Sequence, residues 1–183
     1  MSKVLAIINP ISGTGSKKSI PDLLARAYAP LEHELLLTYT KAAGHAEELA
    51  RRAAEEGYDH VIAVGGDGTV NEVARGLVGS KTALAIVPKG SGNGLARALG
   101  LSMSTDRVIK QLASGRRITI DSCLMNGQPF FCTCGMGFDA AVSRSFAEAS
   151  TRGPVTYLRT MIDEYRAFKP ETYRIILDDG ERT

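Results

Sequence analysis

The sequence predicts an α/β fold built on a doubly wound, mostly parallel sheet. Two observations carry this prediction: short apolar segments alternate with amphipathic ones, and the apolar segments are rich in Val, Ile and Leu, as is typical of strands buried on both faces. The expected strands are residues 3–9, 33–39, 60–65 and 83–88. Because such alternation returns the chain repeatedly to one edge, a ligand is expected outside the carboxyl ends of the strands.

Helices are expected between these strands, at residues 17–29, 44–57 and 69–79. The second has the clearest pattern, with small apolar side chains on one face and Glu and Arg side chains on the other. Its apolar face consists of Ala46, Leu49, Ala50, Ala53 and Ala54. We therefore expect this helix to pack one side against the sheet.

The pattern changes after about residue 117. Two strands are expected around the Asn126-Gly127 pair, which is a strong hairpin signal, and residues 172–183 predict a further strand that enters a turn. A strand that begins a hairpin is a poor place for a domain to end. We expect residues 1–117 to form the α/β domain and residues 118–183 to be the incomplete beginning of a β-rich second domain. The strand edge would then pair with further residues or with a second copy of the chain, as a homodimer.

Composition excludes several classes of protein. The chain has 183 residues, and its 22 basic residues nearly balance its 20 acidic ones, which argues against a nucleic-acid binder that works through a general basic field. The N-terminal apolar stretch is too short for a signal peptide, and no segment approaches the roughly 20 apolar residues of a membrane span. A cytoplasmic protein that binds no nucleic acid is expected.

The cysteines and histidines do not predict a metal centre. Cys123, Cys132 and Cys134 lack the CxxC pairs or neighbouring histidines of a zinc site, so we expect them to be reduced and buried. The three histidines are scattered and are interpreted as surface or structural residues. Metal ligands stay unknown at this point.

Glycine-rich loops follow each expected strand and should meet at one edge of the sheet. Glycine loops at helix N-termini suit phosphate, because backbone N–H groups can point at the anion and the helix dipole favours negative charge. The loops are NPISGTGSKK (9–18), TYTKAAGH (38–45), GGDGTVNE (65–72) and PKGSGNGLAR (88–97). The chain has no GxxxxGK[ST] and no GxGxxG after a strand, which counts against P-loop NTPases and dinucleotide-dependent dehydrogenases.

Asp67 lies inside the third of these loops. An acid there would repel phosphate unless a cation intervenes or the acid takes part in the chemistry, so Asp67 indicates phosphoryl transfer with Mg²⁺. The alternative is that Asp67 is an N-cap of the helix that follows it. Capping alone does not account for the first and fourth loops.

Four motifs in this order resemble the catalytic domain of the diacylglycerol kinase and sphingosine kinase superfamily, and especially the soluble bacterial lipid kinases. The motifs are NPISG, GGDGTVNEV, PKGSGNGLARALG and GMGFDA. The resemblance covers roughly residues 3–141. GGDGT by itself is also found in NAD kinases and some phosphofructokinases, but the four ordered motifs together favour a lipid kinase.

The resemblance implies that ATP binds at these loops. The residues it assigns to the nucleotide are Asn9, Pro10, Ile11, Ser12, Gly13, Thr40, Gly65, Gly66, Asp67, Gly68, Thr69, Val70, Asn71 and Ser91. Asn93 and Arg97 also match residue types usual in the family, with helix capping and a surface role as their alternatives. Asp67 is the candidate catalytic residue, either as the base that deprotonates the acceptor or as an organiser of Mg²⁺ and phosphate.

The function implied is transfer of the γ-phosphoryl group of ATP to a lipid alcohol such as diacylglycerol or a sphingoid base. The second domain would then bind lipid, and the protein would touch the membrane surface transiently. An amphipathic segment at residues 145–168 would lie on the lipid path or pack as an ordinary helix. In bacterial lipid kinases the proposed base lies in a C-terminal region beyond residue 183, so the chain is expected to be inactive alone. Two alternatives stay open, an NAD kinase-like enzyme and a non-catalytic nucleotide-binding homologue, and the identity of the lipid is not predicted.

Overall fold

The computed structural model describes residues 2–13, 17–149, 153–177 and 180–182, and it divides into two compact units, Met1–Cys134 and Gly135–Thr183. The first unit contains the parallel sheet and all of the glycine loops discussed above. The assignment of residues 1–117 and 118–183 to two domains stays a prediction. No helix among the described residues has the length and apolar character needed to cross a membrane.

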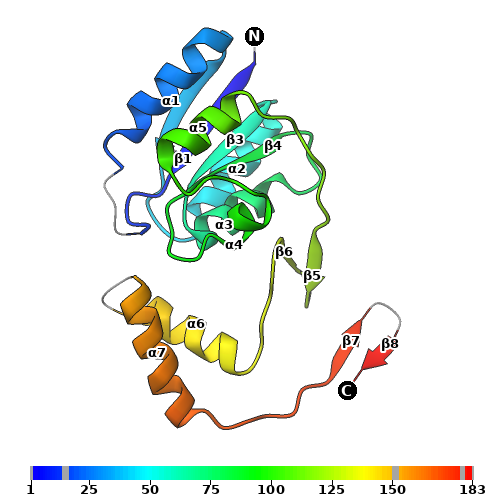
Figure 1. Ribbon diagram of the computed structural model, residues 1–183. Coiled ribbons are helices and arrows are strands. Elements are labelled where there is room, and N and C mark those ends of the chain that lie inside the picture. Colours follow the sequence, from blue (N-terminus) through cyan, green and yellow to red (C-terminus); the bar gives the residue numbers. More distant parts are fainter. Residues whose placement is uncertain (1, 14–16, 150–152, 178–179, 183) are drawn as a thin grey trace. The chain divides into compact units, whose positions relative to one another are not determined.

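The first unit is built on a four-stranded parallel sheet (Figure 1). The spatial order of its strands is β2-β1-β3-β4, so the chain reverses its direction of winding after β2. All three strand pairs are parallel, with Ile7 opposite Thr38 on one side and Ala63 on the other. The strands are β1 (Lys3–Ile8), β2 (Glu34–Tyr39), β3 (His60–Gly65) and β4 (Ala83–Pro88). The predicted fold class is confirmed.

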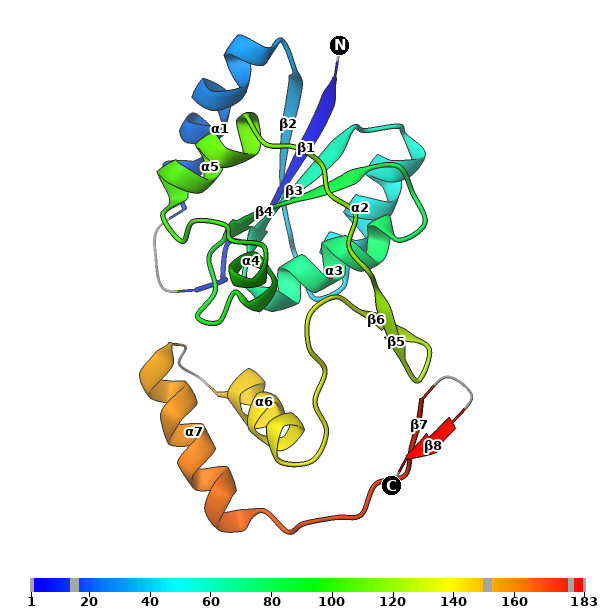
Figure 2. The same ribbon diagram turned by 45° about the vertical axis from the view of Figure 1, so that its right-hand side comes forward.

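Helices cover both faces of this sheet (Figure 2). One face carries α1 (Ile20–Tyr28) and α5 (Thr105–Ala113), and the other carries α2 (His45–Glu55) and α3 (Asp67–Leu77). Alternate residues of β1 supply the two cores: Ala6 and Ile8 pack with α1 and α5, whereas Ile7 packs with α2 and α3. This alternation explains why the strands are apolar on both faces. A short 3₁₀ turn, Ala29–Leu31, follows α1.

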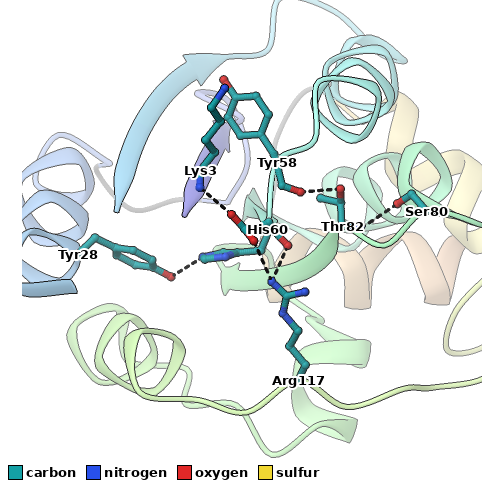
Figure 3. A network of polar contacts seen from close by, with 8 residues as sticks. Lys3, Tyr28, Tyr58, His60, Ser80, Thr82 and Arg117 are labelled. Atoms are coloured by element: carbon teal, nitrogen blue, oxygen red, sulfur yellow. Dashed lines mark hydrogen bonds and ion pairs between the residues drawn. The ribbon is translucent and has the colours of Figure 1, made fainter. Parts of the chain in front are cut away.

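The amino ends of the strands carry a network of polar side chains that has a structural role (Figure 3). The His60 ring lies 3.2 Å from the hydroxyl of Tyr28, and the two rings are tilted by 38° with their centroids 5.6 Å apart. Asp59 accepts the backbone N–H of Lys3 at 2.8 Å and lies 3.8 Å from the Arg117 guanidinium, which ties the segment after α5 to the sheet. This network lies at the end of the sheet opposite the glycine loops.

The predicted hairpin around Asn126-Gly127 is present. Strands β5 (Cys123–Met125) and β6 (Gln128–Phe130) pair in antiparallel fashion, and both turn residues have positive φ, as a two-residue hairpin turn requires. The prediction of buried cysteines is wrong, because Cys123, Cys132 and Cys134 are free but exposed. For Cys123 the reason is that a two-stranded ribbon offers no second layer, whereas Cys132 and Cys134 lie in the segment after β6.

The second unit begins with two helices, α6 (Phe138–Glu148) and α7 (Pro154–Ala167). The single amphipathic segment expected at residues 145–168 is therefore divided between two helices, because α7 starts at Pro154, a residue suited to the first helical position. Strands β7 (Ile175–Leu177) and β8 (Gly180–Arg182) then pair with each other. Among the described residues β7 has no second partner strand, so the predicted pairing of its free edge stays a prediction.

Candidate functional site

The glycine loops gather at the carboxyl edge of the sheet, which we call the loop edge. Asn9 follows β1, Thr40 follows β2, Gly66 follows β3 and Lys89 follows β4. Because the four strands are parallel, these positions share one edge, and the Thr40 N–H donates to the carbonyl of Ile8 at 3.0 Å. The sequence-based expectation of convergence is correct.

Asn9 joins the first loop to the third. Its side-chain nitrogen donates to Thr69 Oγ1 at 2.9 Å, and its side-chain oxygen accepts the backbone N–H of Ile11 at 3.1 Å. The Ser12 hydroxyl donates to the Asn9 carbonyl at 3.1 Å. Asn9 therefore orders its own turn while it holds the start of α3. By contrast, the Ile11 side chain projects into solvent with 84% of its surface exposed.

The N-terminus of α3 presents backbone donors at the loop edge. Gly66 is its extended N-cap residue, and Asp67 and Gly68 form its first turn, where N–H groups have no partner within the helix. Gly68 is exposed, and a Cβ added there would meet nothing within 4 Å. Val70 differs, because its side chain is buried and its N–H is donated to the Gly66 carbonyl at 3.0 Å. Val70 thus belongs to the core.

The carboxylate of Asp67 does not cap α3. Its two oxygens accept the backbone N–H groups of Asn93 at 2.8 Å and Gly94 at 2.6 Å. Both donors lie at the start of the short helix α4 (Gly94–Ala98) in the fourth loop. The alternative that Asp67 is an N-cap of α3 is therefore wrong, since no side chain caps α3 and the Asp67 carboxylate bonds the start of α4.

Asn93 and Arg97 hold the fourth loop in shape. Asn93 is buried in the left-handed conformation at φ 55, and its side-chain oxygen and nitrogen bond the N–H and carbonyl of Gly90, each at 2.8 Å. Arg97 Nε donates to the Gly92 carbonyl at 2.8 Å. The helix-capping alternative for Asn93 is wrong, because its side chain bonds Gly90 and not α4, whereas Arg97 is exposed, in line with its surface alternative. Ser91 lies exposed in the turn that they close.

Close backbone contacts join the loops. A Cβ on Gly90 would lie 2.6 Å from the Gly66 Cα, and a Cβ on Gly13 would lie 1.9 Å from the Lys89 carbonyl oxygen. Gly13 also has a φ of +61, a conformation that L-residues with side chains rarely adopt. At these positions glycine lets one loop touch another, whereas the sequence had suggested only that it leaves room for phosphate.

Two lysines at the loop edge were missed from the sequence. Lys17 Nζ donates to the carbonyls of Pro10 and Ser12, and Lys89 Nζ donates to Thr105 Oγ1 at 3.1 Å. Burial, together with the positive charge of Lys89, lowers the pKa of Lys17 below its ordinary 10.5. Lys17 lies near the end of the first loop and Lys89 near the start of the fourth. Their positions in these loops were the sequence signal that could have identified them.

The described residues offer no metal centre of their own. No group of three or more His, Cys, Asp or Glu side chains among them could hold a metal ion. A cavity of about 490 Å³ lies against α5 at Arg107 and Lys110, and another of about 380 Å³ lies against α7 in the second unit at Tyr165.

Loops of this kind at the carboxyl edge of a doubly wound sheet define a class of phosphate-binding α/β domains. The family model "Diacylglycerol kinase catalytic domain" matches residues 3–125. The chain belongs to this family, which lies within the lipid kinase superfamily predicted from the four motifs.

Similar proteins agree with this assignment. The chain is 35% identical over 145 residues to a diacylglycerol kinase of Bacillus subtilis, covering 75% of this chain and 46% of that protein. It is 32% identical over 178 residues to a diacylglycerol kinase of Staphylococcus saprophyticus, covering 94% of this chain and 58% of that protein. A crystal structure of a diacylglycerol kinase from Bacillus anthracis superposes with a TM-score of 0.63 at 32% identity, over 70% of this chain and 48% of that one. The chain thus spans about half the length of these relatives.

Proposed function

We propose that this chain is the nucleotide-binding part of an ATP-dependent lipid kinase, which transfers the γ-phosphoryl group of ATP to the hydroxyl of a lipid such as diacylglycerol or a sphingoid base. The observation that carries the proposal is the loop edge itself. There, the first turn of α3 and the side chain of Lys89 offer donors and positive charge to an anion. Phosphoryl transfer depends mainly on such positioning and charge neutralisation.

The residues of this chain would bind and orient the nucleotide. The open amides of Asp67 and Gly68 suit phosphate oxygens, since a helix N-terminus favours negative charge. Asn9 and Thr69 hold the first loop beside that N-terminus through their 2.9 Å bond. Mg²⁺ bound with ATP would supply charge neutralisation for the phosphates.

The lipid half of the proposal is supported by the relatives named diacylglycerol kinase. A lipid alcohol resides in a bilayer, so the protein would touch a membrane surface from the cytoplasmic side. The class of acceptor is a primary or secondary hydroxyl of a lipid. The identity of the acceptor lipid depends on the residues that contact the lipid. The residues of the loop edge would contact only the nucleotide.

ATP binding by the 183-residue chain tests the nucleotide half. Calorimetric titration with Mg·ATP should give saturable binding, which excess pyrophosphate should weaken by competition for the same donors. Absence of binding would overturn the proposal. Phosphorylation of NAD in place of a lipid would support the NAD kinase-like alternative.

A chimera tests the lipid half. Residues 1–134 would replace the matching segment of the Bacillus subtilis diacylglycerol kinase, and the product would receive γ-labelled ATP with micelles of diacylglycerol, ceramide, sphingosine or monoacylglycerol. Label should appear in at least one lipid. ATP binding by a folded chimera that labels none of them would support the non-catalytic alternative.

A further inference from the structure

Both oxygens of the Asp67 carboxylate are engaged by the fourth loop. Oδ2 accepts the Asn93 N–H at 2.8 Å and Oδ1 accepts the Gly94 N–H at 2.6 Å. Hydrogen bonds from N–H groups to a carboxylate are among the stronger ones in proteins, and both of these are short. A carboxylate on the first turn of α3 thus closes the start of a segment that lies 26 and 27 residues further along the chain.

The fourth loop is shaped to receive this carboxylate. A Cβ on Gly92 would lie 2.9 Å from Asp67 Oδ2, and a Cβ on Gly90 would lie 2.6 Å from the Gly66 Cα. Asn93, in its left-handed conformation, turns its N–H toward Asp67 while its side chain closes the turn on Gly90. The N-terminus of α3 and the fourth loop therefore hold together through two hydrogen bonds and one direct backbone contact.

We infer that Asp67 is a positioning residue, whose carboxylate clamps the fourth loop to the phosphate-binding N-terminus of α3 and keeps this bond when nucleotide is bound. This inference rests on the proposed function and assigns Asp67 a role other than base or metal ligand. If the carboxylate turned to a hydroxyl or a metal ion, the N–H groups of Asn93 and Gly94 would lose their acceptor. Asn93 is buried, so leaving its N–H without an acceptor is costly, and this favours the clamped state.

Nuclear magnetic resonance on the wild-type chain tests the clamp without any substitution. Scalar coupling across the hydrogen bonds, from the amide nitrogens of Asn93 and Gly94 to Asp67 Cγ, together with downfield amide proton shifts, should be present in the free chain. Both signatures should persist when Mg·ATP saturates the chain. Their loss on nucleotide binding would overturn the inference, since the carboxylate would then have moved to the metal or the substrate site.

Two substitutions remove the same contact from opposite sides. Asp67→Asn replaces one acceptor oxygen with a donor, and Gly92→Ala places a methyl group 2.9 Å from Oδ2, close enough to displace it, while the carboxylate itself is kept. Each should weaken Mg·ATP binding on the order of tenfold, as expected when a binding loop is displaced. The double variant should bind Mg·ATP no more weakly than the weaker-binding of the two single variants, because both changes break one clamp. Asp106→Asn is the matched control, since Asp106 pairs with Lys110 on the surface of α5.

The outcomes separate this inference from the proposed function. If Gly92→Ala bound Mg·ATP as the wild type does, or if the two losses multiplied in the double variant, Asp67 would act independently of the fourth loop and the clamp would be rejected. Circular dichroism would establish that each variant is folded before its affinity is compared. If the wild type bound no ATP, the proposed function would fail. The clamp would still be tested by the scalar couplings in the free chain, and their absence would overturn it.

Discussion

Acidification should weaken the fold through His60, at the edge of the sheet opposite the loop edge. Its ring is partly buried, and groups from four surrounding segments face it: Tyr28 of α1, His33 before β2, the neighbouring Asp59 and Arg117 after α5. Burial, as the largest cause, and then the charges of His33 and Arg117 together lower the pKa of His60 to about 4, while Asp59 opposes them. The imidazole is therefore neutral in the folded chain.

The sign follows from which state binds the proton. Below the ordinary pKa of 6.5 the unfolded chain takes up a proton on this ring, whereas the folded chain does so only near 4, so stability is complete above 6.5 and is lost as the pH falls toward 4. At about 1.4 kcal/mol per pKa unit the full difference corresponds to about 3 kcal/mol. Because the ring is only partly buried, solvent screening reduces this, and we expect a loss of about 1 kcal/mol between about pH 7.5 and about pH 5.

Urea unfolding followed by circular dichroism at these two pH values measures the effect. His60→Gln, which retains a partner for the Tyr28 hydroxyl, should remove most of the loss, whereas the same substitution at His45, outside this cluster, should not. Asp59 also has a lowered pKa, chiefly through the Lys3 N–H, but its contribution is lost only at lower pH. An equal loss of stability in the wild type and in His60→Gln would refute the reasoning.

Two predictions concern the loop edge. Gly90→Ala should lower the free energy of unfolding by about 1–3 kcal/mol, because the methyl group would press on the backbone of Gly66. Gly68→Ala should leave the free energy of unfolding unchanged or raise it by about 0.5 kcal/mol, and it should weaken ATP binding. Urea unfolding and calorimetry measure both, and equal stability of the two variants would contradict the loop contact. Lys89→Met should raise the pKa of Lys17 toward its ordinary value and should weaken ATP binding about tenfold. Carbon-13 resonance of the Lys17 Cε measures this pKa. An unchanged pKa and affinity would exclude a shared cationic site.

The strands and their arrangement were predictable from the sequence. The continuous apolar run at residues 60–65 coincides with β3, and the run at residues 83–88 coincides with β4. A strand buried on both faces needs apolar side chains throughout, so its signal is local and complete. The boundary of α3 was less accurate: it begins at Asp67 rather than 69, because Gly66 acts as its N-cap in an extended conformation.

Convergence of the loops was also predictable, because parallel strands joined by helices bring their carboxyl ends to one edge. The partners of Asp67 were not. They are backbone N–H groups of Asn93 and Gly94, and every residue other than proline carries such a donor, so no side chain in the fourth loop identifies them. The same holds for the close approach of Gly90 to Gly66, which the sequence shows only as two glycines.

Burial and charge in three dimensions were decided by tertiary structure alone. Cys123 was expected inside because cysteine is usually buried, but exposure depends on whether a second layer covers the residue, and the pattern of a short ribbon does not contain that information. Lys17 and Lys89 are 72 residues apart in the sequence, and the charge of Lys89 lowers the pKa of Lys17 only because the first loop folds onto the fourth. Local periodicity thus determined the elements and their order, since it depends on neighbouring side chains. The contacts that give the loop edge its chemistry join distant segments, and only the folded chain brings those segments together.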